Sequence, residues 1–305
     1  MKARTTLMTG CLVLLLIAGF TSCKEHGVSI NDEENVAEET TYISDTVEVA
    51  QVKNFLTEEM SGVRCGNCPA GAIFLEELNE ANGNRFRVVA IHQGSLTNMI
   101  KDRPAPKVNS RQDFTTVHGG KILSVIFGEQ GNKPCVSFDR HPIGNGTNKY
   151  LVDGASNWPQ KIVEMKTRRD KTPVNLKVES KFNAEKDQYE IKVTLHYTQA
   201  VTGDNNLFVY LTENDIKDAF IDSDTNITYN HVFRGAVTDP TGKLILRNTD
   251  KGPGRTYIYR SAFKIDKTDA KQAMWVPENM KVVAFVSYPG PEDKSVLQVQ
   301  EVNLQ

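Results

Sequence analysis

The sequence predicts a three-layer α/β domain followed by an all-β sandwich. Before about residue 169, apolar runs typical of strands alternate with segments whose apolar residues recur at helical spacing. After Pro173, apolar and polar residues alternate with a period of two, as they do in half-buried strands. The chain has 305 residues, which is enough for two domains, and we expect these at 46–169 and 170–305.

The first half is expected to alternate between strands and helices. Asn82-Gly83 predicts the end of its first helix, and Pro104 and Pro106 predict an irregular connection. The short apolar run at 86–92 is typical of a buried central strand. The expected elements are strand 47–55, helix 68–82, strand 86–92, loop 97–112, helix 114–127, strand 135–138 and helix 157–169.

The second half is expected to form a β-sandwich of immunoglobulin-like type, because about eight short strands are separated by turn signals with scarcely a helix. The turn signals rich in glycine, proline and aspartate lie at 202–204, 239–242 and 251–254. The expected strands are 174–178, 189–197, 207–211, 230–237, 244–246, 257–263, 281–288 and 296–302.

The N-terminus has the pattern of an export signal. Lys2 and Arg4 precede an apolar run at 7–20, which is shorter than the roughly 20 residues that a membrane-spanning helix needs. A basic segment followed by a short apolar segment is typical of secretory signal peptides. We therefore expect residues 1–22 to be a signal peptide.

Cys23 follows the apolar run and two small residues directly, as the acylated cysteine does in a bacterial lipobox. We therefore expect a lipid on the Cys23 thiol, which would anchor the chain to a membrane. Ordinary cleavage near Ser22 is the alternative. The stretch that follows is polar and acidic, so residues 23–45 are expected to be the lipidated cysteine and a flexible tether.

Composition excludes several classes of partner and cofactor. Lys and Arg number 36 against 38 Asp and Glu, a formal net charge of −2, and no basic run is present, so nucleic acid is not expected as a partner. Five cysteines are too few for a disulfide-stapled scaffold. A zinc site at Cys65 and Cys68 would need two more ligands, and none stands at the usual spacing, so neither a metal nor another cofactor is expected.

The motif Cys65-Gly66-Asn67-Cys68 lies between an expected strand and an expected helix. The first turn of a helix has unpaired N–H groups and partial positive charge, which favour a thiolate, and Arg64 adds a neighbouring cation. The spacing lets the second sulfur attack a mixed disulfide formed at the first. The motif therefore predicts thiol–disulfide exchange, and a structural disulfide that never turns over is the alternative.

This motif and three later segments resemble the outer membrane protein twenty-eight family. Its signature, Glu-Glu-Phe-Thr-Gly-x-x-Cys-x-Asn-Cys-Pro, is similar to Glu58-Glu59-Met60-Ser61-Gly62-Val63-Arg64-Cys65-Gly66-Asn67-Cys68-Pro69-Ala70. Its C-terminal half is similar to 229–234, 281–286 and 296–299. The family comprises outer membrane lipoproteins of Gram-negative bacteria, with a thioredoxin-like domain followed by an immunoglobulin-like one. The resemblance implies a cell-envelope protein, on the periplasmic or surface face, whose partners are the thiols or disulfides of exported proteins.

The resemblance also assigns roles to residues. Cys65 matches the exposed nucleophile and Cys68 the resolving thiol, and the two are expected to pair as a disulfide. Pro134 matches the cis-proline that offers backbone groups to a substrate peptide. Glu59 matches the buried carboxylate that accepts the proton of the resolving thiol, with Glu58 as its competitor.

Two departures and one extra cysteine accompany this match. Arg64 replaces the usual tryptophan and Asn67 the usual proline, which leaves the reduction potential unassigned. Cys135 follows Pro134 directly, and we interpret it as a strand residue rather than a third redox thiol. The competing function is a surface or periplasmic binding lipoprotein with no enzymatic activity. Neither function predicts an oligomeric state.

Overall fold

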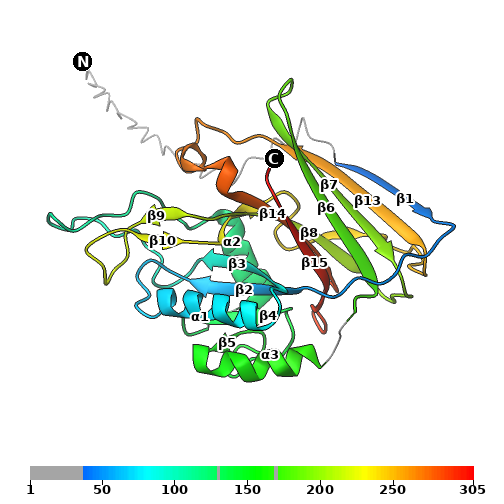
Figure 1. Cartoon of the computed structure of the whole chain (residues 1–305), viewed down its shortest axis with the longest axis horizontal. Coiled ribbons are helices and arrows are strands. Elements are labelled where there is room, and N and C mark those ends of the chain that lie inside the picture. The colour runs from blue at the N-terminus through cyan, green and yellow to red at the C-terminus, as the bar shows by residue number, and fades with distance from the viewer. Residues whose placement is uncertain (1–36, 129–130, 168–170) are drawn as a thin grey trace, which may run out of the picture.

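A nine-stranded sheet runs through the residues that the computed structural model describes, which are 37–128, 131–167 and 171–305 (Figure 1). Only the pairs β2–β3 and β3–β11 are parallel in this part of the chain. In spatial order the strands are β15 (Val296–Asn303), β14 (Met280–Ser287), β8 (Asn205–Glu213), β11 (Val232–Ala236), β3 (Phe86–His92), β2 (Phe55–Ser61), β4 (Cys135–Phe138) and β5 (Val152–Asp153), and β12 (Lys243–Ile245) pairs with β8.

The sheet joins the two halves of the sequence. Strands β2 to β5 come from the first half, and β8, β11, β14 and β15 come from the second half. The junction is at β3 and β11, where Val232 lies opposite Ala90 and the Ala90 N–H donates to the His231 carbonyl at 2.8 Å. The boundary predicted between residues 169 and 170 therefore divides the chain but does not divide this sheet.

A four-stranded sheet packs against one end of the large sheet. Its order, within the described ranges, is β1 (Glu38–Ile43), β13 (Arg255–Phe263), β7 (Gln188–Tyr197) and β6 (Val174–Asn183). Apolar side chains of β6 and β7 meet Val209 of β8 and Val282 and Ala284 of β14 in one buried cluster. The second half thus forms two stacked layers of strands.

Strand β1 corrects the expected tether. Residues 23–45 were expected to be flexible, but Glu38–Ile43 pair with β13 in regular antiparallel register. Ion pairs and hydrogen bonds hold this polar strand: Glu39 contacts Lys243 at 2.6 Å and accepts a hydrogen bond from Tyr257 at 2.7 Å. The expected signal peptide at 1–22 and the expected lipidation at Cys23 lie outside the described residues.

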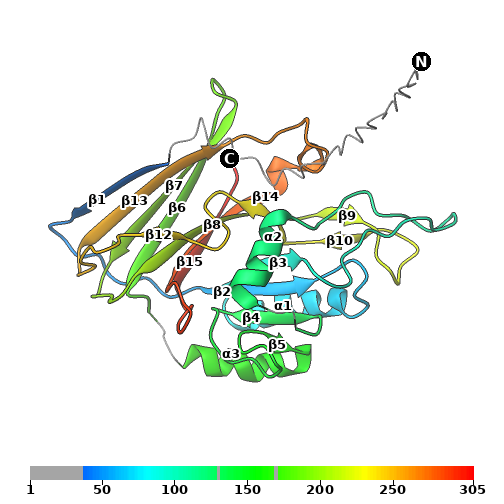
Figure 2. The ribbon, with the colours of Figure 1, turned by 180° about the vertical axis from the view of Figure 1, so that it is seen from behind.

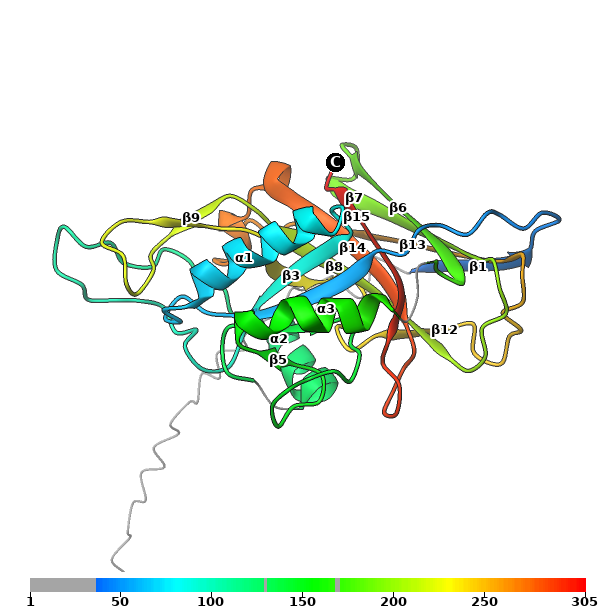
Figure 3. The same ribbon diagram turned by 60° about the horizontal axis from the view of Figure 1, so that its bottom comes forward.

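Helices cover both faces of the first-half strands. α1 (Cys68–Ala81) and α3 (Trp158–Lys166) lie side by side over β2 and β3 (Figure 3). Phe74 of α1 stacks on Trp158 of α3. α2 (Val117–Lys121) and the π-helical turn η1 (Ile122–Phe127) lie on the opposite face (Figure 2). The short 3-10 turns are η2 (Ala155–Asn157), η3 (Gln272–Met274) and η4 (Pro277–Asn279).

Alternation along the strands separates two cores in the first half. Leu56 and Met60 of β2 pack with η1 on one face, whereas Phe55 packs with α1 and α3 on the other. Residues 55, 57, 59 and 61 therefore face α1, and residues 56, 58 and 60 face η1. This parity decides which of Glu58 and Glu59 reaches the disulfide at the start of α1.

Most expected elements are present, and the misplaced ones have a physical reason. The strand expected at 47–55 begins only at Phe55, because Val47 and Val49 are exposed rather than buried. The helix expected from residue 114 begins at Val117, since the Thr116 side chain accepts a hydrogen bond from the Gly119 N–H and caps it. The short hairpin of β9 (Ile216–Asp218) and β10 (Ile227–Tyr229) was not expected. In the described ranges, no helix is long and apolar enough to cross a membrane.

Candidate active site at the Cys65–Cys68 disulfide

The expected disulfide is present at the start of α1. Cys65 and Cys68 are joined by an S–S bond of 2.04 Å, and Cys68 is the first residue of the helix. The Cys68 N–H donates to the Cys65 carbonyl at 2.9 Å, which folds the two cysteines toward each other. Because the helix begins here, its unpaired N–H groups and partial positive charge lie beside both sulfurs.

Cys65 is buried, which contradicts the exposed nucleophile expected from the resemblance. Only 2% of the residue is accessible. The segment at 94–99 packs against its neighbours: the Arg64 N–H donates to the Leu96 carbonyl at 2.9 Å. The Arg64 guanidinium donates to the carbonyls of Asn98 and Met99 at 2.9 and 2.8 Å. Arg64 therefore fastens this segment beside the disulfide rather than presenting a free cation.

A segment from the second half of the chain covers the motif from another side. The Ile221 N–H donates to the Val63 carbonyl at 3.0 Å. The Asp222 carboxylate lies against Gly66, so close that a Cβ on Gly66 would come within 2.7 Å of it. Sequence reasoning about the first half alone could not predict this covering segment.

Pro134 lies against the first turns of α1. The Lys133–Pro134 peptide bond is cis, and a Cβ on Gly71 of α1 would come within 2.9 Å of the proline ring. Glycine at this position therefore allows the close approach of the proline loop to the helix that carries Cys68.

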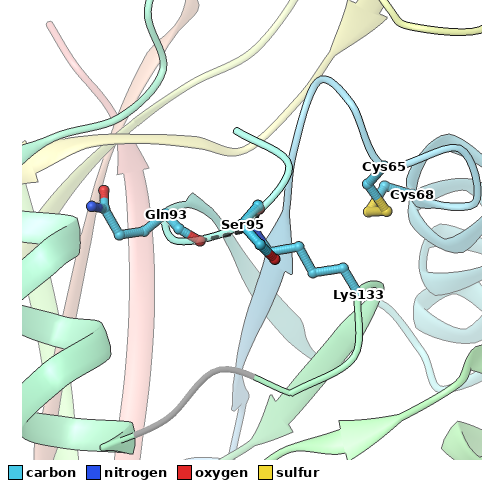
Figure 4. Close-up of a disulfide and its surroundings, with 5 residues drawn as sticks. All are labelled: Cys65, Cys68, Gln93, Ser95 and Lys133. Atoms are coloured by element: carbon cyan, nitrogen blue, oxygen red, sulfur yellow. Dashed lines mark hydrogen bonds between the residues drawn. A yellow bond between two sulfur atoms is a disulfide. The ribbon is translucent and has the colours of Figure 1, made fainter. Parts of the chain in front are cut away.

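Lys133 links the loop that carries Pro134 to the covering segment at 94–99 and to Gln93 just before it. Figure 4 shows its side chain extending from beside the disulfide toward Gln93 and Ser95. Its ammonium donates to the carbonyls of Gln93 and Ser95 at 2.8 and 2.6 Å. Burial lowers the pKa of Lys133 to about 8, because the ammonium is removed from water without a carboxylate partner.

Glu59 lies in a cavity of about 320 Å³ whose wall also includes Cys68. Its side chain is 97% buried, and its Oε1 atom has no hydrogen-bond partner. Burial raises the pKa of the Glu59 carboxyl to about 7, and the nearby Glu76 carboxylate adds to the rise. A carboxyl that titrates near neutrality can accept or release a proton at the pH of most compartments.

Glu58, the competing carboxylate, faces the opposite side of β2. Arg140 donates to both of its oxygens, at 2.8 and 2.7 Å, and the guanidinium also donates to the Tyr210 hydroxyl at 3.3 Å. The Arg140 guanidinium stacks on the rings of Phe208 and Phe285. Glu58 therefore belongs to a buried ion pair and does not reach the disulfide.

The cavity contains two further polar groups that the sequence did not indicate. His231 Nε2 lies 2.7 Å from Glu76 Oε1, and this contact lowers the pKa of the Glu76 carboxyl. Burial lowers the pKa of His92 to about 3, so its imidazole is neutral. His231 reaches α1 only because β11 pairs with β3, so no spacing in the sequence could have identified it.

Cys135 does not have the properties of a third redox thiol. It is fully buried in the core beneath η1, opposite Met60 of β2. Burial raises the pKa of its thiol to about 12, and the carboxylate of Asp153 contributes to the rise. The thiol is therefore protonated at neutral pH, and a protonated thiol is a poor nucleophile.

The fold and this site define a mostly β-sheet protein that carries a Cys-X-X-Cys disulfide at the start of a helix. The chain belongs to the family of outer membrane protein Omp28, whose model matches residues 129–305, more than half of the chain. The matched residues include Pro134 and His231 but not Cys65 or Cys68. Among the described residues, no group of three or more His, Cys, Asp or Glu side chains could hold a metal ion.

Solved structures with a similar fold are distant in sequence. HBP35 of Porphyromonas gingivalis matches with a TM-score of 0.61 and 18% identity, over 84% of this chain and 77% of that chain. A protein from Agrobacterium tumefaciens matches with a TM-score of 0.47 and 10% identity, over 83% and 96% of the two chains. No curated protein matches the sequence. At 18% identity, the likeness to HBP35 shows a shared fold and nothing more.

Proposed function

We propose that this chain is an exported envelope lipoprotein whose Cys65–Cys68 pair exchanges disulfides with the thiols of other exported proteins. The observation that carries this proposal is the position of Glu59, a buried carboxyl with an unpartnered oxygen in the cavity behind Cys68. A disulfide kept only for stability needs no proton acceptor, and burying an unpaired carboxyl costs stability. In disulfide exchange, that carboxyl would transfer a proton to or from the Cys68 sulfur.

A substrate dithiol is oxidised in two exchange steps. A substrate thiolate attacks Cys65 Sγ, a mixed disulfide forms, and the bond to Cys68 Sγ breaks. Cys68 leaves as a thiolate and takes a proton from the Glu59 carboxyl. The second substrate thiolate then attacks the substrate sulfur of the mixed disulfide and releases Cys65 as a thiolate, which the α1 N-terminus stabilises. The substrate is oxidised and the pair reduced; the reverse sequence reduces a substrate disulfide.

Access to Cys65 requires local movement. The sulfur is buried, and the segments at 94–99 and 220–223 pack against its neighbours in the chain. The bond between Ile221 and Val63 is one backbone hydrogen bond, and Asp222 contacts Gly66 through a side chain. Opening such contacts costs far less than global unfolding. We propose that an incoming polypeptide displaces the 220–223 segment and lies along Pro134.

The same proposal covers domain organisation and anchoring. Residues 46–169 would form a thioredoxin-like domain and residues 170–305 an immunoglobulin-like sandwich, which share the nine-stranded sheet. After removal of the signal peptide at 1–22, lipid on Cys23 would hold the protein at the outer membrane of a Gram-negative bacterium. Metabolic labelling with a radioactive fatty acid tests this anchor: label is expected on the wild type and not on Cys23→Ser.

A second candidate function is supported by the burial of Cys65. With 2% of the residue accessible, the disulfide could act only as a staple between the β2–α1 loop and α1. The protein would then be a binding lipoprotein with no enzymatic activity. In that case reduction of the disulfide would lower stability, and no substrate would be turned over.

Reduction of insulin in the presence of dithiothreitol separates the two functions. The wild type is expected to accelerate precipitation of the insulin chains, and Cys65→Ser is expected to remove the acceleration. Cys135→Ser is the matched control, because it also removes one thiol, and it should behave as the wild type. Traces that are the same for the wild type and Cys65→Ser would establish the binding lipoprotein instead.

A further inference from the structure

The cavity beside the disulfide lies between the two halves of the chain and is open to solvent at one side. One wall is α1 and the floor is β2 and β3, whereas the opposite wall is β10 with Asn230 and His231, which precede β11. Most of its surface is apolar. The lining residues that bear on its chemistry are Glu59, Cys68, Glu76, His92, Tyr229 and His231.

Two buried polar side chains in this wall have atoms without a hydrogen-bond partner, although the Ser61 hydroxyl interacts with the Glu59 carboxyl. Glu59 is 3% exposed with Oε1 unpartnered, and His92 is 4% exposed with neither ring nitrogen in hydrogen-bond geometry. The Ala90 backbone acts to raise the pKa of the His92 ring, but neither ring nitrogen has a hydrogen-bond partner in good geometry. Buried polar groups are nearly always satisfied, so these two indicate a bound group that completes them. His92 takes no part in the proposed disulfide exchange, so exchange does not account for its unpartnered nitrogens.

We propose that this cavity binds a small neutral molecule with an aromatic body and one hydroxyl-type head group directed at Glu59 and His92. A cavity of about 150 Å³ lined by apolar side chains accommodates benzene, so about 320 Å³ accommodates a bicyclic ring system. Cys68 sulfur and the ring of Tyr229 in the wall favour an aromatic body.

The charges around the cavity select a neutral head group. Glu59 and Glu76 would repel an anion. A cation would be repelled by the positive charges of Lys133 and Arg234, which also lower the pKa of His92. The Glu76 carboxylate, which could attract a cation, is already paired with His231. A hydroxyl both donates and accepts, and so satisfies the carboxyl and the neutral imidazole together.

The mouth of the cavity allows entry and gives a way to block it. Ala72 and Ile73 of α1 are exposed at this edge, and Ile73 is 63% accessible, which is unusual for a large apolar side chain. Because Ala72 is exposed, Ala72→Trp can cover the mouth without entering a core. Ala81 is also exposed on α1 but does not line the cavity, so Ala81→Trp is the matched control.

Titration of the mature chain with 2-naphthol, followed by the fluorescence of that probe and by calorimetry, tests the proposal. We expect one site, binding about tenfold tighter than naphthalene, which has the same body without the head group. Ala72→Trp should weaken 2-naphthol binding at least about tenfold, and Ala81→Trp should leave it unchanged. Glu59→Leu should remove the preference for 2-naphthol over naphthalene.

Three results would overturn the site. They are no binding of either probe, binding that survives Ala72→Trp, and equal binding of both probes to the wild type. Circular dichroism of each variant must match the wild type, so that lost binding is not lost folding. The result is independent of redox activity, because Cys65→Ser, which ends disulfide exchange, is expected to bind 2-naphthol as the wild type does.

Discussion

Glu58 and Glu59 are consecutive in β2, yet Glu58 is paired with Arg140 at 2.7 Å and Glu59 shares a cavity with Cys68. The division follows from the pleat, because neighbouring side chains of a strand point to opposite faces. The face toward η1 supplies a guanidinium, and the face toward α1 supplies a mostly apolar cavity and the Ser61 hydroxyl. One carboxylate is therefore paired with a cation, and the other is left to titrate near neutrality.

Glu59→Gln is expected to slow disulfide exchange at least about tenfold near neutral pH, since Gln has a similar shape but cannot accept the proton of Cys68. The measurement is single-turnover reaction of the reduced protein with a disulfide peptide across pH. The wild-type rate should rise with a midpoint near the Glu59 pKa of about 7. Glu77→Gln, which neutralises an exposed carboxylate of α1, is the control. Equal profiles for wild type and Glu59→Gln would exclude Glu59 from the reaction.

Glu59 is also expected to make the folded state less stable as pH rises. Its pKa is raised from 4.5 to about 7, so between these values the folded state binds more protons than the unfolded state, and stability falls with increasing pH. At about 1.36 kcal/mol per pH unit, the full penalty is about 3 kcal/mol above pH 7 and is absent below pH 4.5. Urea unfolding of wild type and Glu59→Gln should diverge over that window. Parallel curves would contradict the raised pKa.

Arg140→Met is expected to destabilise the protein by about 3–5 kcal/mol, because it leaves the buried Glu58 side chain without its ion-pair partner. Denaturant unfolding measures the change. The double variant Glu58→Leu with Arg140→Met should recover much of the loss, since no uncompensated charge remains. Lys177→Met, which breaks the exposed pair with Glu179, should cost less than about 1 kcal/mol. An equal cost for the two single variants would mean that Glu58 finds another partner.

Cys135 is expected to resist alkylation in the folded protein, because its thiol is buried with a pKa raised to about 12. After reduction with dithiothreitol, iodoacetamide at about pH 8 should label Cys65, which the proposed opening of the 220–223 segment exposes, while Cys135 stays unmodified. Peptide mass spectrometry of quenched samples distinguishes the two. Labelling of Cys135 at the rate of Cys65 would restore it as a candidate third thiol.

Much of the order of elements could be predicted from the sequence, because strong periodicity reflects burial. The run at 86–92 and the alternation at 189–197 correspond closely to β3 and β7. Two features were predicted wrongly because their structure depends on pairing with distant strands. Strand β1 is exposed throughout and is held by pairing with β13, so its apolar pattern is weak. The sheet shared by both halves depends on β11 pairing with β3, which local sequence does not encode.

The site was predictable only in the parts that lie close together in the sequence. Cys65, Cys68 and Glu59 belong to one strand–loop–helix unit, so a motif identifies them and parity places Glu59 toward α1. The burial of Cys65 depends on the segments at 94–99 and 220–223, and His231 contacts Glu76 from 155 residues away. Such contacts are tertiary, and no spacing rule anticipates them.

The central claim is that Cys65 is the sulfur that exchanges with a partner. Cys68→Ser leaves Cys65 without its resolving thiol, so incubation with a disulfide peptide should trap a mixed disulfide at Cys65, identified by mass spectrometry of the adduct. We expect this adduct in Cys68→Ser and its loss when Cys65→Ser is added. No adduct, or an adduct on Cys135, would mean that Cys65 does not exchange and that the disulfide is a structural bridge.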